Sequence, residues 1–349
     1  MYNPKVSVII PTLNRFELLK QTLNSLQCQT FKDWEALVVD DGSNVDTVNT
    51  LQLISKEDQR IRYIKRSREV SGASACRNEG VELSQGKYII FLDSDDNIKK
   101  TALANRFAEM EARPTLDFGV FPCMLFNEYP GDMNLLWNID SKEHDIDRFL
   151  AQDIPWQTTS PIWRRESLYK LGNWDETLPS WQDWEFHFRA LINDFKYKKF
   201  GEPDCFWRVP DRSNESSSIG MKSTSKTHLI SHRQLFIKVY SELIRHEKLT
   251  EKRKKLISGL CIWSLDKFLF QNEFIEAKLT WNLYLQERLI DKTTYKQGLF
   301  YISLLKPNYH SKFLWRATRR GILEASNFLL PYEKRPYKKN LLRKVKVFA

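Results

Sequence analysis

Short apolar runs alternate with segments of helical spacing along the first 113 residues of the chain. The runs predict strands at 6–10, 34–43 (ending in a turn), 60–65 and 87–93, and the segments between or after them predict helices at 16–26, 73–84 and 101–112. Apolar strands separated by helices indicate an α/β fold with a mostly parallel sheet that is covered on both faces. In such a sheet, ligands bind at the carboxyl ends of the strands.

The pattern changes after residues 211–226, a Ser-rich polar stretch that we interpret as a linker or a mobile loop. Beyond it, apolar residues recur at intervals of three and four, which predicts a string of antiparallel helices. These helices are expected at 227–248, 251–271, 273–290 and 294–306. We therefore divide the chain into an α/β domain at 1–215 and an all-α C-terminal domain at 216–349.

Charge divides the chain at the same place. Residues 1–215 carry 27 Lys and Arg against 34 Asp and Glu, a net charge of −7, whereas residues 216–349 carry 27 against 10, a net charge of +17. A basic helical region is either a solvated surface or one that attracts an anionic membrane or an acidic partner. We expect no nucleic-acid partner and rank a nucleic-acid-binding protein well below an enzyme, because the basic residues form no recognised nucleic-acid-binding module.

The end of the chain, 310–349, combines an amphipathic helical pattern with a strongly basic terminus. This combination suits peripheral attachment to an anionic cytoplasmic leaflet, and a packed helix with a solvated tail is the alternative. The apolar run 6–10 is too short for a signal-peptide core, and no uncharged apolar run approaches the roughly 20 residues that span a bilayer. We therefore expect a cytoplasmic protein, with the inner face of the plasma membrane as a site of attachment.

Overall composition predicts a folded protein, since 42% of the residues are hydrophobic and 28% are charged. The five cysteines are scattered and contain no CxxC pair, so they indicate neither a disulfide framework nor a zinc site.

Polar clusters follow three of the predicted strands: PTLNR at 11–15, DDGS at 40–43 and DSDD at 93–96. Each cluster alone is a plausible turn, but three strand ends of one sheet bring them toward one crevice. Closely packed carboxylates repel one another unless a cation is present, and hard oxygen ligands favour Mg²⁺ or Mn²⁺. Such a metal usually bridges to phosphate, and the chain contains neither a P-loop nor GxGxxG, so we expect a diphosphate-bearing substrate.

Four ordered blocks, at 6–43, 72–80, 86–96 and 171–190, together resemble glycosyltransferase family two, whose members have the Rossmann-like GT-A fold. The resemblance covers roughly residues 4–212, and four blocks in order are far more specific than one short motif. It implies inverting transfer of a sugar from a nucleoside-diphosphate sugar, usually a UDP-sugar, to a hydroxyl of a saccharide or lipid-linked acceptor. Surface polysaccharide biosynthesis is the usual setting of such enzymes.

The resemblance also assigns roles to residues near the strand ends. Pro11 and Thr12 are expected in the nucleoside pocket, Asp41 is similar to the aspartate that hydrogen-bonds the base, and Asp40 supports the turn. Arg77 resembles a motif arginine that faces the nucleotide. An arginine that binds a strand-end carboxylate for structural reasons alone is the alternative.

The DXD motif of the family corresponds to Asp93, Ser94 and Asp95. The resemblance places Asp93 near the ribose or a metal-bound water, and Asp95 on the metal that bridges the two phosphates. Asp96 is the less certain member, and the sequence identifies no third metal ligand.

The catalytic base is expected at Asp183, in the segment WQDWEF, where family members commonly have Glu-Asp and this chain has Gln182-Asp183. Trp181 and Trp184 could form an apolar wall that raises the pKa of Asp183 and a face on which a sugar stacks. Glu185 is the local rival for the role of base. A helix N-cap is the structural alternative for Asp183.

The segment 121–166 is rich in Trp, Tyr and Pro and has no regular period, so we predict loops and short edge strands that hold the acceptor. Trp137, Trp156 and Trp163 are candidates for stacking on sugars, although packing is the commoner role of such residues. His187 is expected to be a surface or packing residue and not a metal ligand. A sugar nucleotidyltransferase and a catalytically inactive nucleotide-sugar-binding protein remain as alternative functions.

Overall fold

A seven-stranded sheet forms the centre of the computed structural model, which describes residues 3–209, 225–305 and 317. Its strands lie in the order β10-β6-β9-β4-β1-β2-β3. Their bounds are β1 Val6–Thr12, β2 Trp34–Asp40, β3 Ile61–Lys65, β4 Tyr88–Phe91, β6 Phe118–Val120, β9 Pro161–Arg164 and β10 Tyr197–Lys199. Of these strands, β9 alone runs antiparallel to its neighbours. The predicted α/β fold with a mostly parallel sheet is therefore confirmed.

A second, four-stranded sheet lies in the order β5-β11-β7-β8. It consists of β5 Asn97–Ile98, β7 Cys123–Phe126, β8 Leu135–Leu136 and β11 Cys205–Arg208. The expectation that 121–166 holds only loops and edge strands is wrong in two respects. The segment contains a short helix, α5 (Asp145–Leu150). Strand β9 of that segment lies inside the main sheet, between β4 and β6, and its residues are buried.

Helices cover both faces of the main sheet and continue into the C-terminal half. They are α1 Phe16–Gln27, α2 Val45–Glu57, α3 Ala73–Leu83, α4 Ala102–Glu111, α5 Asp145–Leu150, α6 Arg165–Leu171, α7 Gln182–Ile192, α9 Lys226–Arg245, α10 Glu251–Phe270, α11 Phe274–Gln286 and α12 Lys292–Leu305. Helix α2 was not predicted, because Thr47 and Leu51 are its buried residues and no apolar stripe marks it. The sequence signal that does exist is Asn44, whose side chain caps the helix by accepting a hydrogen bond from the Thr47 amide.

Successive side chains of β1 point to opposite faces of the sheet, so they belong to two hydrophobic cores, one on each face. Val6, Val8 and Ile10 pack on the side that α1 covers, whereas Ile9 packs on the side of α3. Helix α3 lies very close to β1, since a Cβ added at Gly80 would approach the Ile9 side chain to 2.4 Å. This close packing carries the polar residues of α3 toward the carboxyl edge of the sheet.

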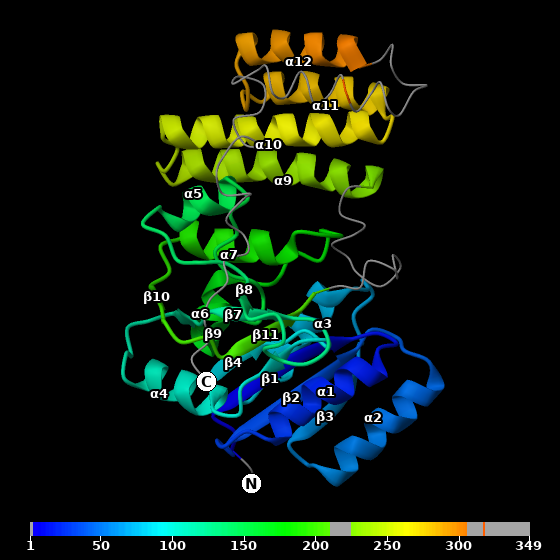
Figure 1. Cartoon of the computed structure of the whole chain (residues 1–349), viewed down its shortest axis with the longest axis vertical. Helices are drawn as coiled ribbons and strands as arrows, with labels where there is room; N and C mark the ends of the chain where they lie inside the picture. Colours follow the sequence, from blue (N-terminus) through cyan, green and yellow to red (C-terminus); the bar gives the residue numbers. More distant parts are fainter. Residues whose placement is uncertain (1–2, 210–224, 306–316, 318–349) are drawn as a thin grey trace.

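The C-terminal helices stack one upon another on the side of α7 that faces away from the sheet (Figure 1). The antiparallel helical string predicted after residue 226 is confirmed for 226–305. The apolar core on the α3 face of the sheet continues through α7 into α9, α10, α11 and α12 without interruption. Within the described residues, no helix combines the length and the apolar character needed to cross a bilayer.

Two predictions fall on parts of the chain that the structure does not describe. The proposed domain boundary at 215 and most of the predicted linker at 211–226 lie within 210–224. The basic segment 310–349 lies outside the described residues apart from residue 317. The division into two domains and the membrane-binding role of the basic terminus therefore stay predictions.

Candidate active site

The carboxyl ends of β1, β2 and β4 lie at one edge of the main sheet. Thr12 pairs with Asp40 in the parallel register of β1 and β2, and Ile9 pairs with Phe91 in that of β1 and β4. The Asp41 amide donates a hydrogen bond of 2.9 Å to the Thr12 carbonyl. The predicted convergence of PTLNR, DDGS and DSDD at this edge is therefore observed.

Thr12 and the two aspartates that follow β2 have different surroundings. Asp40 accepts a hydrogen bond from the Ser43 amide at 3.1 Å, so it closes the turn as predicted. Asp41 accepts hydrogen bonds from Nε of Arg66 at 2.5 Å and from the Gly72 amide at 2.9 Å. The buried Thr12 Oγ1 has no hydrogen-bond partner among the described residues, which leaves it able to bind a ligand.

Arg77 connects α3 to the end of β4. Its Nη2 donates a 2.7 Å hydrogen bond to Oδ1 of Asp93, and its guanidinium lies 4.5 Å from the centre of the Trp174 ring. The Arg77 side chain is 6% exposed, whereas the Asp93 carboxylate is 33% exposed. The structural role that we considered for Arg77 is therefore present, and it holds a partly accessible carboxylate at the strand end.

The carboxylates of the DSDD cluster do not all face the same way. Asp95 pairs with Arg15 at 3.1 Å and is 30% exposed, while Ser94 is buried. Asp96 is fully buried and accepts hydrogen bonds from the Thr159 hydroxyl at 2.8 Å and the Arg208 amide at 3.1 Å. Burial raises the pKa of Asp96 well above its ordinary value, and the neighbouring aspartates raise it further. Asp96 therefore stabilises the DSDD cluster through buried hydrogen bonds to Thr159 and Arg208.

Asp183 lies in the first turn of α7, near the Arg77–Asp93 pair. Burial raises the pKa of the Asp183 carboxyl, the positive charge of Arg77 opposes that rise, and the charge of Asp93 adds to it. The side chain is half-buried, and its Oδ1 accepts a 2.9 Å hydrogen bond from the Trp184 amide. The N-cap of α7 is Trp181, so the interpretation of Asp183 as an N-cap is wrong.

Comparison with known proteins decides the family. The family model described as Glycosyl transferase family 2 matches residues 7–172. An uncharacterized glycosyltransferase of Methanocaldococcus jannaschii is 31% identical over 238 residues, which are 65% of this chain and 80% of that protein. The chain belongs to glycosyl transferase family 2. The match of the family 2 model ends before Asp183, so it says nothing about the base.

A second family 2 relative is the GalNAc(5)-diNAcBac-PP-undecaprenol beta-1,3-glucosyltransferase of Campylobacter jejuni. It is 41% identical over 101 residues, and these are 29% of this chain and 33% of that protein. The alignment thus spans only about a third of either chain.

Solved structures agree with the GT-A fold of this family 2 glycosyltransferase. The structure of S. aureus TarS 1-349 in complex with UDP has a TM-score of 0.63 and 18% identity, with 92% of each chain covered. The mannosyltransferase PcManGT from Pyrobaculum calidifontis, in complex with GDP-Man and Mn2+, has a TM-score of 0.51 and 16% identity, with 96% of this chain and 89% of that chain covered. Identities this low establish the fold alone.

The buried and paired surroundings of Glu185 favour Asp183 over it as the base of this family 2 enzyme. Arg189 binds the buried Glu185 carboxylate through two hydrogen bonds of 2.9 and 3.1 Å, and Lys238 binds it at 3.2 Å. A buried carboxylate that pairs with two cations is less available to a substrate hydroxyl than the partly exposed Asp183.

The expected sugar-stacking face at Trp181 and Trp184 is wrong. Trp184 is 3% exposed, donates its indole N–H to the Phe149 carbonyl at 3.0 Å and stacks on Phe188. Trp181 packs against His232 of α9, with ring centroids 4.3 Å apart. Both rings are structural, although the predicted desolvation of Asp183 is observed.

Two of the three candidate tryptophans of 121–166 are also core residues. Trp156 and Trp163 are almost completely buried, whereas Trp137 is partly exposed and packs edge-on against Trp207. His187 is a packing residue, as expected, and burial lowers its pKa to about 3.

Sequence reasoning missed several residues that hold the site in place. Arg15 pairs with Asp95, and its position directly after β1 in PTLNR was a usable signal. Asn78 binds the Trp174 backbone reciprocally, with its Oδ1 accepting at 2.8 Å and its Nδ2 donating at 3.0 Å. Arg208 donates from Nε to the Asp95 carbonyl at 3.1 Å, and nothing in its sequence context indicated this contact.

A divalent cation would find only part of its ligands in the protein. No three His, Cys, Asp or Glu side chains are grouped to hold a metal ion in the described part of the chain. Asp93 and Asp95 are the two partly exposed carboxylates at the strand end. Mg²⁺ and Mn²⁺ at phosphate-transfer sites are commonly bound by one or two carboxylates together with substrate phosphates, so these residues fit such a metal.

Proposed function

We propose that the protein is an inverting glycosyltransferase that moves a sugar from a nucleoside-diphosphate sugar to an acceptor hydroxyl. The observation that carries the proposal is that the charges of Arg77 and Asp93, which pair at the carboxyl edge of the sheet, both act on the pKa of the Asp183 carboxyl. A half-buried carboxylate therefore lies within electrostatic range of a strand-end aspartate that the family resemblance associates with the donor.

Asp183 acts as the general base in this proposal. Its carboxylate takes the proton of the acceptor hydroxyl while the hydroxyl oxygen forms a bond to the anomeric carbon. The bond from that carbon to the diphosphate oxygen breaks, and its electron pair leaves with the nucleoside diphosphate. A single displacement from the opposite face inverts the anomeric centre.

The donor is a UDP-sugar, bound by Pro11, Thr12, Asp41 and Arg77. The free Thr12 Oγ1 and the adjacent Asp41 supply hydrogen-bonding groups for the nucleoside. Asp41 is pre-oriented by Arg66 and Gly72, which fixes its direction before the donor arrives. The structural likeness to TarS, solved with UDP, supports this choice of donor.

The metal is Mn²⁺ or Mg²⁺, held by Asp95 and approached by Asp93 and Ser94. When bound, a divalent cation supplies positive charge that stabilises the leaving diphosphate. Arg15 forms an ion pair of 3.1 Å with Oδ2 of Asp95, so a metal ligand from Asp95 would share this carboxylate with Arg15. The likeness to a mannosyltransferase solved with GDP-Man and Mn2+ supports the choice of metal.

The acceptor is a saccharide or a lipid-linked glycan, and the setting is surface polysaccharide biosynthesis. The Campylobacter jejuni relative, named for a PP-undecaprenol glycan, supports a lipid-linked acceptor. We place the enzyme at the cytoplasmic side of the membrane, with the basic terminus as its contact to anionic lipid.

Purified full-length protein is incubated with a panel of radiolabelled nucleoside-diphosphate sugars and Mn²⁺, and the released nucleotide is scored. We expect release of UDP that depends on metal and is abolished in Asp183→Asn. Release of pyrophosphate instead would indicate a nucleotidyltransferase, and binding without release would indicate an inactive sugar-nucleotide-binding protein. Either of these outcomes overturns the proposal.

A further inference from the structure

Residues 180–181, directly before the proposed base, are held by helix α9. The Ser180 hydroxyl lies 2.9 Å from Nε2 of His232 and 2.9 Å from Nδ1 of His228. The two histidines are one turn apart on α9, so their side chains lie on the same face of the helix and both contact Ser180. Ser180 is 1% exposed and His232 is fully buried.

The charge state of this cluster favours a fixed arrangement. Burial, together with a smaller effect of the nearby His228, lowers the pKa of His232 to about 3, so His232 is neutral at physiological pH. A hydroxyl has one proton, so Ser180 donates to one imidazole and accepts from the other. Both hydrogen bonds of the Ser180 hydroxyl are therefore made only when the three side chains keep their positions.

Trp181 continues this contact into the start of α7. Its backbone has a φ of 61°, a left-handed conformation that is rare for a bulky residue and persists only where the surroundings impose it. Its ring packs on His232 at 4.3 Å, on Trp263 of α10 at 5.1 Å and on Phe236 of α9 at 5.6 Å. The turn that begins α7 is thus imposed by the C-terminal helices.

We propose that Ser180, His228 and His232 are positioning residues that hold the Asp183 carboxylate in the geometry needed for transfer. Asp183 follows the fixed turn by two residues, at the second position of α7. The inference rests on the proposed role of Asp183 as the base. It makes α9 a required part of the active site and not an accessory to it.

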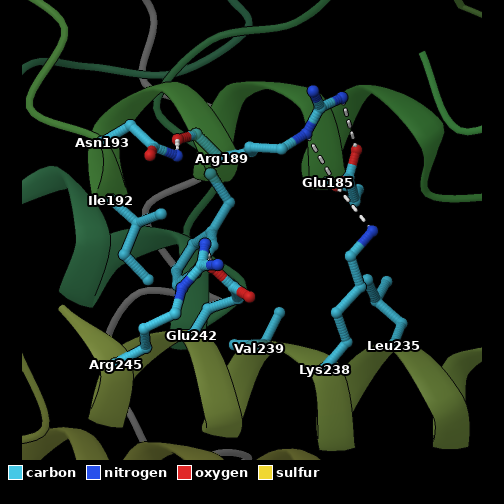
Figure 2. A pocket seen from close by; sticks show the side chains of 10 residues that line it. Glu185, Arg189, Ile192, Asn193, Leu235, Lys238, Val239, Glu242 and Arg245 are labelled. Atoms are coloured by element: carbon cyan, nitrogen blue, oxygen red, sulfur yellow. Dashed lines mark hydrogen bonds and ion pairs between the residues drawn. The ribbon is translucent and has the colours of Figure 1, made fainter. Parts of the chain in front are cut away.

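The remainder of the α7–α9 junction is packed less closely, so a residue there can be substituted as a control for the Ser180 cluster. A groove of about 240 Å³ lies between the later turns of the two helices, lined by Ile192 and Asn193 of α7 and by Val239, Glu242 and Arg245 of α9 (Figure 2). Arg245 lies on the same helix as the two histidines and is 67% exposed. Arg245→Ala therefore alters the junction without touching the Ser180 cluster.

The test compares Ser180→Ala, His228→Asn, Ser180→Ala with His232→Leu, and Arg245→Ala in the full chain, by steady-state transfer and by UDP binding. We expect Ser180→Ala to lower kcat about tenfold while the donor KM changes less than about twofold, because a misplaced base affects the transition state alone. Ser180→Thr, which keeps the hydroxyl, is expected to restore kcat. His232→Leu is expected to add little to Ser180→Ala, since the residues act as one unit.

The half-exposed His228 provides the variant whose folding is least affected, and His228→Asn is expected to lower kcat in the same direction. Unchanged kcat in both Ser180→Ala and His228→Asn, or a loss of kcat in Arg245→Ala equal to theirs, overturns the inference. If Asp183→Asn is inactive while these variants are fully active, only the inference fails. If Asp183→Asn keeps transfer, the proposed base fails with it.

Discussion

Arg77 donates a 2.7 Å hydrogen bond to Asp93 from a guanidinium that is otherwise packed over the face of Trp174. The contact fixes a positive charge beside Asp93, and this charge also lowers the pKa of the half-buried Asp183. The balance of charge around the proposed base therefore depends on Arg77, and it can be measured.

Replacement of Arg77 by Gln is expected to move the acidic limb of the pH–activity profile to higher pH. Asp183 must be ionised to accept a proton, so kcat/KM falls as the pH drops through its pKa. Burial already raises that pKa and Arg77 lowers it, so losing the charge of Arg77 raises the pKa of Asp183 further. The measurement is kcat/KM against pH. Arg15→Gln, which removes a charge beside Asp95, is the control, and we expect its acidic limb to lie at the same pH as that of the unmodified protein.

Asp183→Asn is expected to lower kcat by about 10²- to 10⁴-fold, because the amide cannot take the acceptor proton. UDP binding, measured by calorimetry, should be unchanged. Glu185→Gln is the matched comparison in the same helix turn, since Arg189 and Lys238 hold Glu185 and keep it from substrate. It is expected to lower the melting temperature and keep measurable transfer. Inactivity of Glu185→Gln in a folded sample would reassign the base.

Asp95→Asn is expected to weaken UDP binding in the presence of Mn²⁺ and to leave metal-free binding unchanged. A neutral amide loses the charge that a hard cation prefers in its ligand. The measurement is UDP affinity with and without Mn²⁺, with EDTA reversing the difference. Asp46→Asn, on the exposed first turn of α2, is the control. Equal loss in the absence of metal would assign Asp95 to direct contact with the donor.

Arg106→Ala is expected to destabilise the fold by about 3–5 kcal/mol, because it leaves the carboxylate of Asp204 buried without a partner. Arg106 is fully buried and binds Asp204 through two hydrogen bonds of 2.8 and 2.6 Å. The free energy of unfolding is measured by urea denaturation. Arg113→Ala removes a half-exposed pair with Glu109 four residues away and should cost no more than about 0.5 kcal/mol.

His187→Leu is expected to reduce the loss of stability on acidification. Folding holds the buried His187 neutral, with a pKa of about 3, while the unfolded chain takes up a proton near pH 6.5. Below pH 6.5 the unfolded state binds the extra proton, so His187 contributes a loss of about 1.4 kcal/mol per pH unit until the pH approaches the folded pKa. The check is the free energy of unfolding at several pH values between 6.5 and 4. A slope unchanged by the substitution would show that His187 titrates normally.

The sequence predicted the helices and strands that have a strong hydrophobic pattern. It did not predict elements that bury few residues or that are buried on both faces. The β1 run and the helices after residue 226 have clear periods, whereas α2 buries few residues and β9 is a short run whose burial on both faces cannot be read from its letters. Trp184 was misassigned because an aromatic residue beside a catalytic candidate packs inward as readily as outward. The i,i+4 spacing of Glu185 and Arg189 did contain the signal for the ion pair that holds Glu185.

The unbroken apolar core between the sheet and the C-terminal helices restricts how this chain can be recombined with its relatives. A chimera that joins the sheet of one transferase to the helices of another would mismatch Trp181 with the rings of His232 and Trp263. Exchange of acceptor specificity is therefore expected to succeed only when α7, α9 and α10 are inherited from the same parent.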